Sequence, residues 1–432
     1  MTETQKLFKN GQIASEKSPT LRQADVLVNE KGSISAVESY IETKPEMDVI
    51  DCSRKILVPG LFDMHVHLRE PGREDKETIE TGTEAAINGG VTGLLAMPNT
   101  TPPIDSGGMV RFVLTLAKER ARIPVMTSGC ITHNRQGKEL AEIADMKEKG
   151  VVMITDDGSP VANSYLFRRA LEYARNFDLI VASHCETMEL SADGAMHEGK
   201  VSYQLGIPGI PACSEEISIE RDLSLAHYTK ARIHIQHVST ARGMEIIRRF
   251  KEEGVHVTAE VTPHHLLFSE EDIGDYNTAF KMNPPLRTKV DNQQLLEGLK
   301  EGIFDIIATD HAPHTTFEKN LDFSSAPFGI TGLETALLSL YTYLVKPGKT
   351  NWNLFVKTYS AEPRRILGLP SVEIKPTHPA EFIVFDPDVT TIINKAFMRS
   401  KSVNTPFLGK ELMGRVEKVI YKNEILLDRL QK

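Results

Sequence analysis

Two histidines, His65 and His67, stand two residues apart in an apolar stretch that runs from Leu57 to Arg69. The stretch is typical of a β-strand, and side chains at positions i and i+2 of a strand point to the same face. Two imidazoles on one face, where a strand ends, can bind one metal ion. A metal-binding role for this pair is favoured because later segments carry metal-compatible or catalytic groups at the ends of similar apolar runs.

Other apolar, β-branched runs also end in polar groups. The first run ends with His65, His67 and Arg69, the second with Asn99, the fourth with Asp156 and Asp157, the fifth with His184, the sixth with His237 and the eighth with Asp310 and His311. Core histidines and helix-capping aspartates would explain single members, but not the whole set.

Imidazole nitrogens and carboxylate oxygens suit zinc and similar borderline metals. One ion would lie at His65 and His67 and a second at His184 and His237, with one shared carboxylate. Two ions about 3.5–4 Å apart can share a hydroxide, because metal binding lowers the pKa of water to roughly 7. The carboxylate of Asp310 can take that proton and return it to a leaving nitrogen. This chemistry is hydrolysis of an amide.

The elements that position these residues repeat along the middle of the chain. Apolar runs occupy residues 61–68, 91–97, 123–128, 151–155, 179–183, 233–238, 256–261 and 303–309, and helical patterns follow most of them. Near-continuous hydrophobic strands that alternate with helices predict an α/β fold, a TIM-like (β/α)8 barrel with its chemistry at the C-terminal strand ends. A doubly wound sheet is the alternative, but no Gly-x-Gly-x-x-Gly follows a strand.

The two ends of the chain have a different texture, with short strands and turns. We expect residues 1–56 and 372–432 to form a composite β domain, a small β-sandwich, and residues 57–371 to form the hydrolase barrel. The net charge of −9 argues against a nucleic-acid partner. No apolar run is long enough for a membrane helix, and the first residues lack the apolar core of a signal peptide. Four widely separated cysteines suggest reduced thiols and a cytoplasmic location.

Several motifs resemble type I dihydroorotase, a family of the cyclic amidohydrolase superfamily. They are His-Val-His-Leu-Arg-Glu-Pro-Gly at 65–72, Met-Pro-Asn-Thr at 97–100, Thr-Asp-Asp-Gly at 155–158, Ser-His-Cys-Glu at 183–186, His-Ile-Gln-His-Val-Ser-Thr at 234–240, Thr-Pro-His-His at 262–265 and Ala-Thr-Asp-His-Ala-Pro-His at 308–314. The resemblance runs from about residue 7 to 425. It implies reversible hydrolysis of (S)-dihydroorotate to N-carbamoyl-L-aspartate in pyrimidine (UMP) synthesis, with one or two Zn²⁺ ions per chain.

The resemblance also implies roles for single residues. The metal ligands would be His65, His67, Asp157, His184 and His237, with Asp310 as general acid/base and further ligand. The substrate carboxylate would be bound by Arg69, Asn99 and His314, and the rest of the substrate by His67, Asn283 and the Phe328-Gly329 backbone. A guanidinium suits a carboxylate because it binds in a bidentate fork. Asn99 and Asn283 precede prolines and have turn capping as an alternative role. We interpret Lys281 and Arg287 as solvated charges at the rim, and His264, His265 and His311 as supporting groups.

The chain departs from the wider superfamily at the fourth strand. Many relatives bridge two metals there with a carboxylated lysine, whereas this chain has Asp156 and Asp157. Family spacing favours Asp157 as the bridge, while strand alternation says only that the two aspartates point to opposite faces. An aspartate is a shorter arm, so the second metal site is expected to be weaker or empty.

Two alternatives remain open from the sequence. The chain could be another cyclic amidohydrolase: a hydantoinase, a dihydropyrimidinase or an allantoinase. It could instead be a non-catalytic homologue that serves as a scaffold for aspartate transcarbamoylase, although it keeps every expected ligand. We expect a small-molecule substrate, a homo-oligomer (a dimer), and aspartate transcarbamoylase as a candidate partner.

Overall fold

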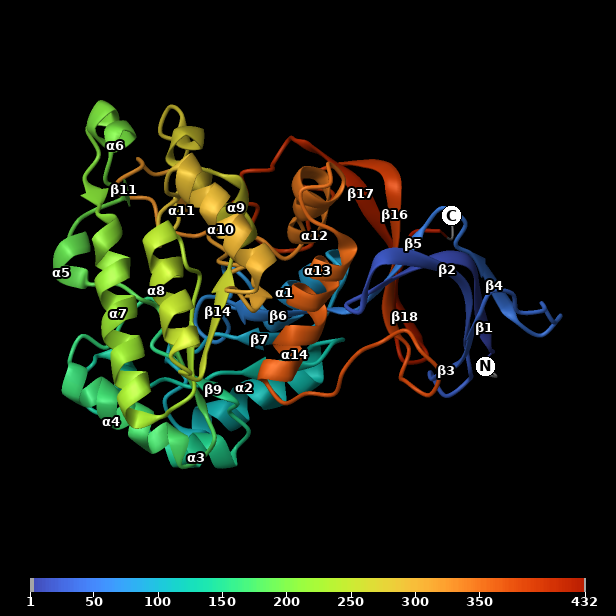
Figure 1. Cartoon of the computed structure of the whole chain (residues 1–432), viewed down its shortest axis with the longest axis horizontal. Helices are drawn as coiled ribbons and strands as arrows, with labels where there is room; N and C mark the ends of the chain where they lie inside the picture. Colours follow the sequence, from blue (N-terminus) through green and yellow to red (C-terminus); the bar gives the residue numbers. More distant parts are fainter. Residues whose placement is uncertain (1–3, 431–432) are drawn as a thin grey trace.

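The computed structural model describes residues 4–430 as an α/β barrel joined to a large β-sheet (Figure 1). The outermost residues of the expected β domain, 1–3 and 431–432, lie outside the described part. All eight expected barrel strands are present, most of them shorter than the apolar runs. They are β6 (Leu61–Val66), β7 (Val91–Ala96), β8 (Val125–Thr127), β9 (Met153–Ile154), β10 (Ile180–Ser183), β13 (Ile233–Ile235), β14 (Val257–Val261) and β15 (Ile306–Ile307).

The barrel strands pair in parallel, as the near-continuous apolar runs predicted. One sheet has the order β6-β7-β8 and the other β15-β14-β13-β10-β9. Parallel bridges from Gly129 to Ile154 and from Val66 to His311 join the two sheets at both of their edges. The carboxyl ends of the strands therefore face one common mouth, where the candidate site residues follow the strands.

Amphipathic helices surround the strands. The longer ones are α1 (Ile79–Asn88), α2 (Gly107–Arg120), α4 (Ser164–Arg175), α7 (Ala212–Thr229), α8 (Ala241–Glu252) and α10 (Lys289–Glu301). Side chains cap several of their N-termini, such as Thr78 at α1 and Thr240 at α8. The shorter ones are α3 (Ile143–Glu148), α5 (Met188–Ser191), α6 (Lys200–Leu205), α9 (Pro263–Leu267), α11 (Thr316–Lys319), α12 (Ala336–Leu340), α13 (Trp352–Val356) and α14 (Glu362–Ile366).

Short irregular turns complete the barrel. The 3₁₀ turns are η1 (His133–Arg135), η2 (Glu270–Ile273) and η3 (Thr278–Phe280), and the π-helical turns are η4 (Tyr341–Val345) and η5 (Lys357–Ala361). The insertion between β10 and α7 carries the two-stranded sheet of β11 (Met196–His197) and β12 (Gly209–Ile210). None of the helices between residues 4 and 430 is long and apolar enough to cross a membrane.

Strands from both ends of the chain share one eight-stranded sheet, seen at the right of Figure 1. Its main order is β18-β17-β16-β5-β1-β2-β3, and β4 pairs with β1. The early strands are β1 (Lys6–Ser15), β2 (Ser18–Val28), β3 (Ile34–Glu38), β4 (Asp48–Asp51) and β5 (Ile56–Pro59), and the late ones are β16 (Glu381–Ile392), β17 (Glu411–Tyr421) and β18 (Glu424–Asp428). The junction is the antiparallel pairing of β5 with β16, where Val58 faces Ile383.

One buried carboxylate ties the first barrel strand to the last. Asp63 in β6 accepts hydrogen bonds from the backbone N–H groups of His65 and Thr309, each at 3.1 Å, and from the Tyr359 hydroxyl at 3.0 Å. Burial raises the pKa of Asp63 to about 6, against the lowering effect of these bonds. This contact fixes the backbone beside His65 and Asp310, so it sets the distance between two parts of the candidate site.

We predict that Phe382→Ala destabilises the protein by about 3–5 kcal/mol, because it opens a cavity in a packed core. Phe382 in β16 is fully buried, and its ring meets that of Phe8 edge to face at 4.9 Å. Urea unfolding followed by circular dichroism measures the change. The matched control is Tyr203→Ala, since that side chain is 89% exposed, and it should shift stability by no more than about 0.5 kcal/mol. Equal effects of the two substitutions would contradict this packing.

Candidate metal centre

A cavity of about 230 Å³ lies at the carboxyl ends of the barrel strands. Every residue that the sequence predicted for the site lines it, except His65, which is fully buried. The lining comprises His67, Arg69, Asn99, Asp157, Gly158, His184, His237, Met282, Asn283, Asp310, Ala312, His314, Phe328 and Gly329. Residues that are up to 262 positions apart in the sequence, from 67 to 329, thus line one cavity.

The predicted metal ligands form three overlapping groups of potential ligand atoms. The groups are His65, His67 and Asp157; Asp157, His184 and His237; and His65, His237 and Asp310, and within each group the ligand atoms lie within 4.8 Å of one another. His65 belongs to two of them, and its Nε2 atom is buried without a hydrogen-bond partner. A buried imidazole nitrogen of this kind is costly unless something binds it, so the donor set fits a metal ion.

The carboxylate of Asp157 lies among all four histidines, and its Oδ1 atom is 3.5 Å from His65 Nε2. Its Oδ2 atom lies 3.5 Å from His67 Nε2, and its Oδ1 atom lies 3.7 Å from both His184 Nδ1 and His237 Nε2. Asp156 instead accepts hydrogen bonds from the Ile131 and Thr132 backbone, at 2.8 and 3.1 Å. Of the two aspartates, only Asp157 has the geometry to bridge two ions.

Two carboxylates to which the sequence analysis gave no role orient the histidines. Glu260 in β14 contacts His65 Nδ1 at 2.5 Å through one oxygen and His234 Nε2 at 3.0 Å through the other. Glu186 contacts His184 Nε2 at 3.0 Å. These contacts leave His65 Nε2 and His184 Nδ1 free to face the cluster, as carboxylates behind metal-binding histidines commonly do. A glutamate inside the apolar run 256–261 was the available signal for Glu260.

The charges in the cluster offset one another. Burial opposes a charge on His65, yet Glu260, Asp310 and Asp157 raise its pKa well above the ordinary value. Burial likewise opposes a charge on His184, but Asp157 and Glu186 raise its pKa to about 9. Burial disfavours the charged form of Asp157, but the surrounding histidines, His65 foremost, hold its pKa well below the usual range. In the absence of an ion, protons on His65 and His184 therefore balance the carboxylates.

The backbone is strained at three site residues. Arg69, His237 and Asp310 have φ angles of 59°, 29° and 46°, in the left-handed region that non-glycine residues rarely adopt. Each costs of order 1–3 kcal/mol, and such residues cluster where function requires a particular geometry. The strain supports a preorganised site.

Two of the expected carboxylate-binding residues, Arg69 and His314, lie next to each other in the cavity lining. Arg69 donates from Nε to the Pro313 carbonyl at 3.2 Å, and His314 lies 3.4 Å from the Arg69 guanidinium. Lys76 Nζ donates to His314 Nδ1 at 3.0 Å, so His314 Nε2 carries the proton and donates to the Phe328 carbonyl at 2.8 Å. These contacts place two cationic side chains, Arg69 and Lys76, around one histidine.

The two asparagines contact the metal-ligand cluster. Asn99 Oδ1 lies 2.8 Å from His67 Nδ1, and its amide donates to Asp157 at 3.3 Å. The amide of Asn283 donates to Glu186 at 2.9 Å. Both side chains thus orient ligand groups while they line the cavity, which the turn-capping alternative did not anticipate.

The structure corrects one interpretation. Lys281 and Arg287, which we expected to be solvated rim charges, are each only 2% exposed. Arg287 donates to the Ile210 carbonyl at 2.9 Å and to Ser239 Oγ at 3.1 Å, so it ties the 187–215 insertion to the end of the sixth strand. The motif Met-Asn-Pro-Pro-Leu-Arg is largely buried by other segments of the chain. The local sequence does not show that distant segments bury its cationic side chain.

The fold is similar to that of solved hydantoinase and dihydropyrimidinase structures. It superposes on L-hydantoinase (dihydropyrimidinase) from Arthrobacter aurescens with a TM-score of 0.87 at 22% identity, over 99% of this chain and 96% of that one. Dihydropyrimidinase from Brevibacillus agri gives a TM-score of 0.84 at 22% identity, over 99% and 96%. Identities this low show the shared fold alone.

Sequence relatives define the group more narrowly. The profile described as Dihydro-orotase-like matches residues 54–243. The dihydroorotase of Pelotomaculum thermopropionicum is 45% identical over 94% of this chain and 95% of its own, and that of Carboxydothermus hydrogenoformans is 44% identical over 99% of both. The chain belongs to the dihydroorotase family, as the motifs predicted.

We predict that divalent metal binding releases protons. His65 and His184 have raised pKa values in the metal-free site, so they are protonated at neutral pH and must lose protons to bind an ion. Apparent affinity should therefore rise with pH. Isothermal titration calorimetry of metal-stripped protein, in two buffers with different ionisation enthalpies, measures the release. Identical heats in both buffers, with affinity constant between about pH 6 and 8, would contradict it.

We predict that Glu260→Gln weakens metal binding by about 10- to 100-fold, because His65 loses the carboxylate that orients it. Metal content after dialysis against a chelator series, measured by elemental analysis, reports the change. Glu417→Gln is the control, since Glu417 is also buried, at 1% exposure, but lies in β17. If both variants retain metal equally, Glu260 does not support the site.

Proposed function

We propose that the protein is a zinc-dependent dihydroorotase that interconverts (S)-dihydroorotate and N-carbamoyl-L-aspartate in pyrimidine (UMP) biosynthesis. The observation that carries this proposal is the meeting of His65, His67, His184, His237 and Asp157 beside Arg69 and His314 in one cavity. The family supplies the substrate, since the relatives named above are dihydroorotases. The cavity supports a reaction that needs both a metal and a bound anion.

Different residues of the chain bind the substrate, bind the metal and transfer the proton. Arg69 binds the substrate carboxylate in a bidentate fork and His314 stands beside it, while Asn283 and the Phe328-Gly329 backbone hold the ring. One or two Zn²⁺ ions, held by the four histidines and Asp157, would supply a water of lowered pKa and polarise the ring carbonyl.

Asp310 carries the proton. Burial alone would raise its pKa, but His65 and His67 lower it, so its carboxylate is ready to accept a proton from the attacking water. As the carbon–oxygen bond forms and the ring carbon–nitrogen bond breaks, Asp310 returns that proton to the leaving nitrogen. The reverse reaction uses the same steps in the opposite order.

The number of bound metal ions depends on how well Asp157 can bridge two of them. The Asp157 carboxylate lies within 3.7 Å of all four histidines, which favours two ions, but its short arm favours a weaker second site than a carboxylated lysine would give. Zinc is favoured because the donors are imidazole and carboxylate.

The further assignments rest on the family resemblance and on composition. We infer a cytoplasmic homo-oligomer, in its simplest form a dimer, with aspartate transcarbamoylase as a candidate partner. The scaffold alternative is disfavoured because the chain retains each predicted ligand and Asp310.

The substrate is tested directly. Purified metal-loaded protein is assayed with dihydroorotate, hydantoin, dihydrouracil and allantoin at equal concentrations. The proposal predicts turnover of dihydroorotate well above the others. Preferred turnover of another ring would assign the chain to a different cyclic amidohydrolase activity, and metal-loaded protein without any turnover would support the scaffold role.

We predict that Asp310→Ala retains metal but lowers kcat by about 100- to 10,000-fold, because the proton carrier is lost. Steady-state kinetics with dihydroorotate and elemental analysis of the same sample separate the two effects. Asp305→Ala is the control, since Asp305 precedes β15 and pairs with Lys251 at 2.7 Å, away from the cavity lining. Normal turnover by Asp310→Ala would remove Asp310 from the mechanism.

A further inference from the structure

Two buried lysines stand behind the wall of the cavity. Lys281 follows η3 and Lys319 ends α11, and they are 2% and 7% exposed. Within residues 4–430, neither ammonium group has a carboxylate within 4.0 Å. A buried cation is costly unless polar groups compensate it, so their partners need an explanation.

The partners are backbone carbonyls, most of them in residues 323–329, which we call the 323–329 loop. Lys281 Nζ donates to the carbonyls of Phe323 and Ser324 at 2.7 and 2.9 Å. Lys319 Nζ donates to those of Pro327 and Gly329 at 3.0 and 3.2 Å. The loop has no regular secondary structure, so no helix or strand hydrogen bonds hold its backbone carbonyls. The two ammonium groups donate to these carbonyls instead.

The lysines are also linked to each other and to the cavity wall. Lys319 Nζ lies 3.5 Å from the Lys281 carbonyl, which itself accepts from the backbone N–H of Gly329 at 2.9 Å. The Lys281 ammonium lies 4.6 Å from the centre of the Phe328 ring, a cation–π distance. Phe328 and Gly329 line the cavity.

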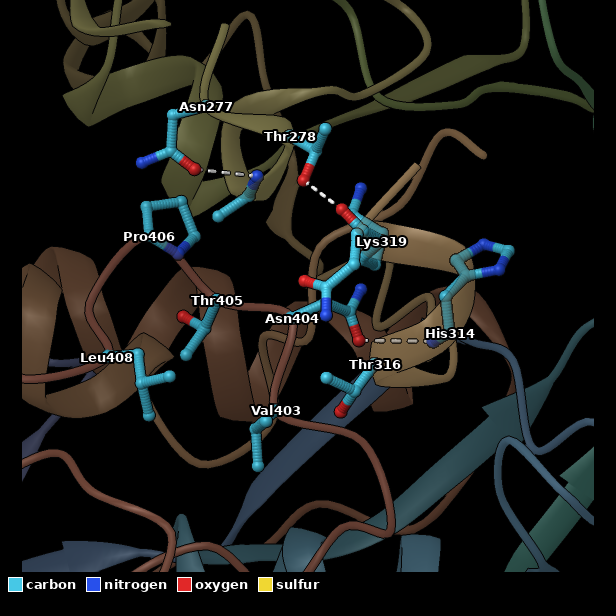
Figure 2. A pocket seen from close by; sticks show the side chains of 12 residues that line it. Asn277, Thr278, His314, Thr316, Lys319, Val403, Asn404, Thr405, Pro406 and Leu408 are labelled. Atoms are coloured by element: carbon cyan, nitrogen blue, oxygen red, sulfur yellow. Dashed lines mark hydrogen bonds between the residues drawn. The ribbon is translucent and has the colours of Figure 1, made fainter. Parts of the chain in front are cut away.

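The surrounding contacts hold the same loop from the other side. Figure 2 shows Lys319 beside Thr278, whose hydroxyl donates to the Lys319 carbonyl, and Asn404, which accepts from the His314 backbone N–H at 3.0 Å. The Asn404 amide also donates to the Gly329 carbonyl at 3.0 Å. Gly329 has a φ of 151°, and an added Cβ would lie 2.6 Å from the Ala312 carbonyl oxygen. The loop is therefore clamped tightly against the catalytic wall.

We propose that Lys281 and Lys319 are positioning residues that clamp the 323–329 loop, so that the Phe328-Gly329 backbone is preorganised to bind the substrate ring. The proposal rests on the proposed function, because the ring is that of the substrate named there. The two charges also add positive potential near the cavity, which favours an anionic substrate. Burial lowers the pKa of Lys281 to about 8 and, with the charge of Lys281, that of Lys319 to about 7.

The test replaces each lysine by methionine, which keeps most of the volume and removes the donor. Lys281→Met and Lys319→Met should raise KM for dihydroorotate about tenfold, the scale of hydrogen bonds to a charged group, with kcat and metal content within about twofold. Hydrogen exchange of peptides covering 320–331 should speed up, while peptides of the barrel strands stay unchanged. Lys418→Met is the control, since Lys418 is 3% exposed in β17 and pairs with Asp428; it should leave both readouts unchanged.

Two outcomes would contradict the proposal. Unchanged KM and unchanged loop exchange in both variants would overturn it, as would an equal effect of Lys418→Met. If a methionine variant does not fold, Lys281→Gln and Lys319→Gln, which keep a shorter donor, carry the same expectation with smaller shifts. If the wild-type protein does not turn over dihydroorotate, the proposed function fails, and loop exchange in the variants still shows whether the clamp exists.

Discussion

The structure depends on mutual neutralisation among buried imidazoles and carboxylates at the strand ends. His65, His184 and Asp157 are each no more than 4% exposed, so water contributes little to their solvation. An isolated charge in such a place would be costly, and each group is tolerable only because its neighbours have the opposite charge. A divalent cation satisfies the same carboxylates and lets the imidazoles act as neutral ligands. The donor set of the cluster therefore fits a divalent ion.

The fold supplies this cluster with fixed distances. Asp63 joins the backbone of the first strand to that of the eighth, and Glu260 reaches from the seventh strand to His65. On the substrate side, buried cations take the same role through backbone carbonyls. Fixed dipoles and charges of this kind need little reorganisation during a reaction, which is the main advantage of a preorganised site.

Much of the barrel followed from sequence because its physics is local. Parallel strands buried on both faces are apolar throughout, so the eight runs were visible, and their polar ends named the candidate metal ligands. Asn283, His314, Phe328 and Gly329 were named only by the family resemblance. The strand bounds were too long, because apolar residues continue beyond the paired segments: the run 303–309 has regular pairing only at Ile306–Ile307. The motifs at 65–72 and 308–314 then identified the family.

What escaped the sequence depends on neighbours distant in the chain. Lys281 and Arg287 look like solvated charges, since nothing near them in sequence shows that other segments cover them. Glu260 acts through His65 and His234 on other strands, so local pattern gave it no role. Glu186 lies only two residues from His184, but the sequence does not show that the two side chains meet. Strand alternation could not choose between Asp156 and Asp157, whereas the distances to His67, His184 and His237 do.

The most direct test of the central claim is an anomalous-scattering map of crystals of the protein, recorded on both sides of the zinc absorption edge. The account predicts a strong peak at the barrel mouth at coordination distance, about 2.0–2.2 Å, from His65, His67 and an Asp157 oxygen. Where the second site is filled, a second peak lies at the same distance from Asp157, His184 and His237. A map from zinc-equilibrated crystals with no peak at these atoms would contradict it.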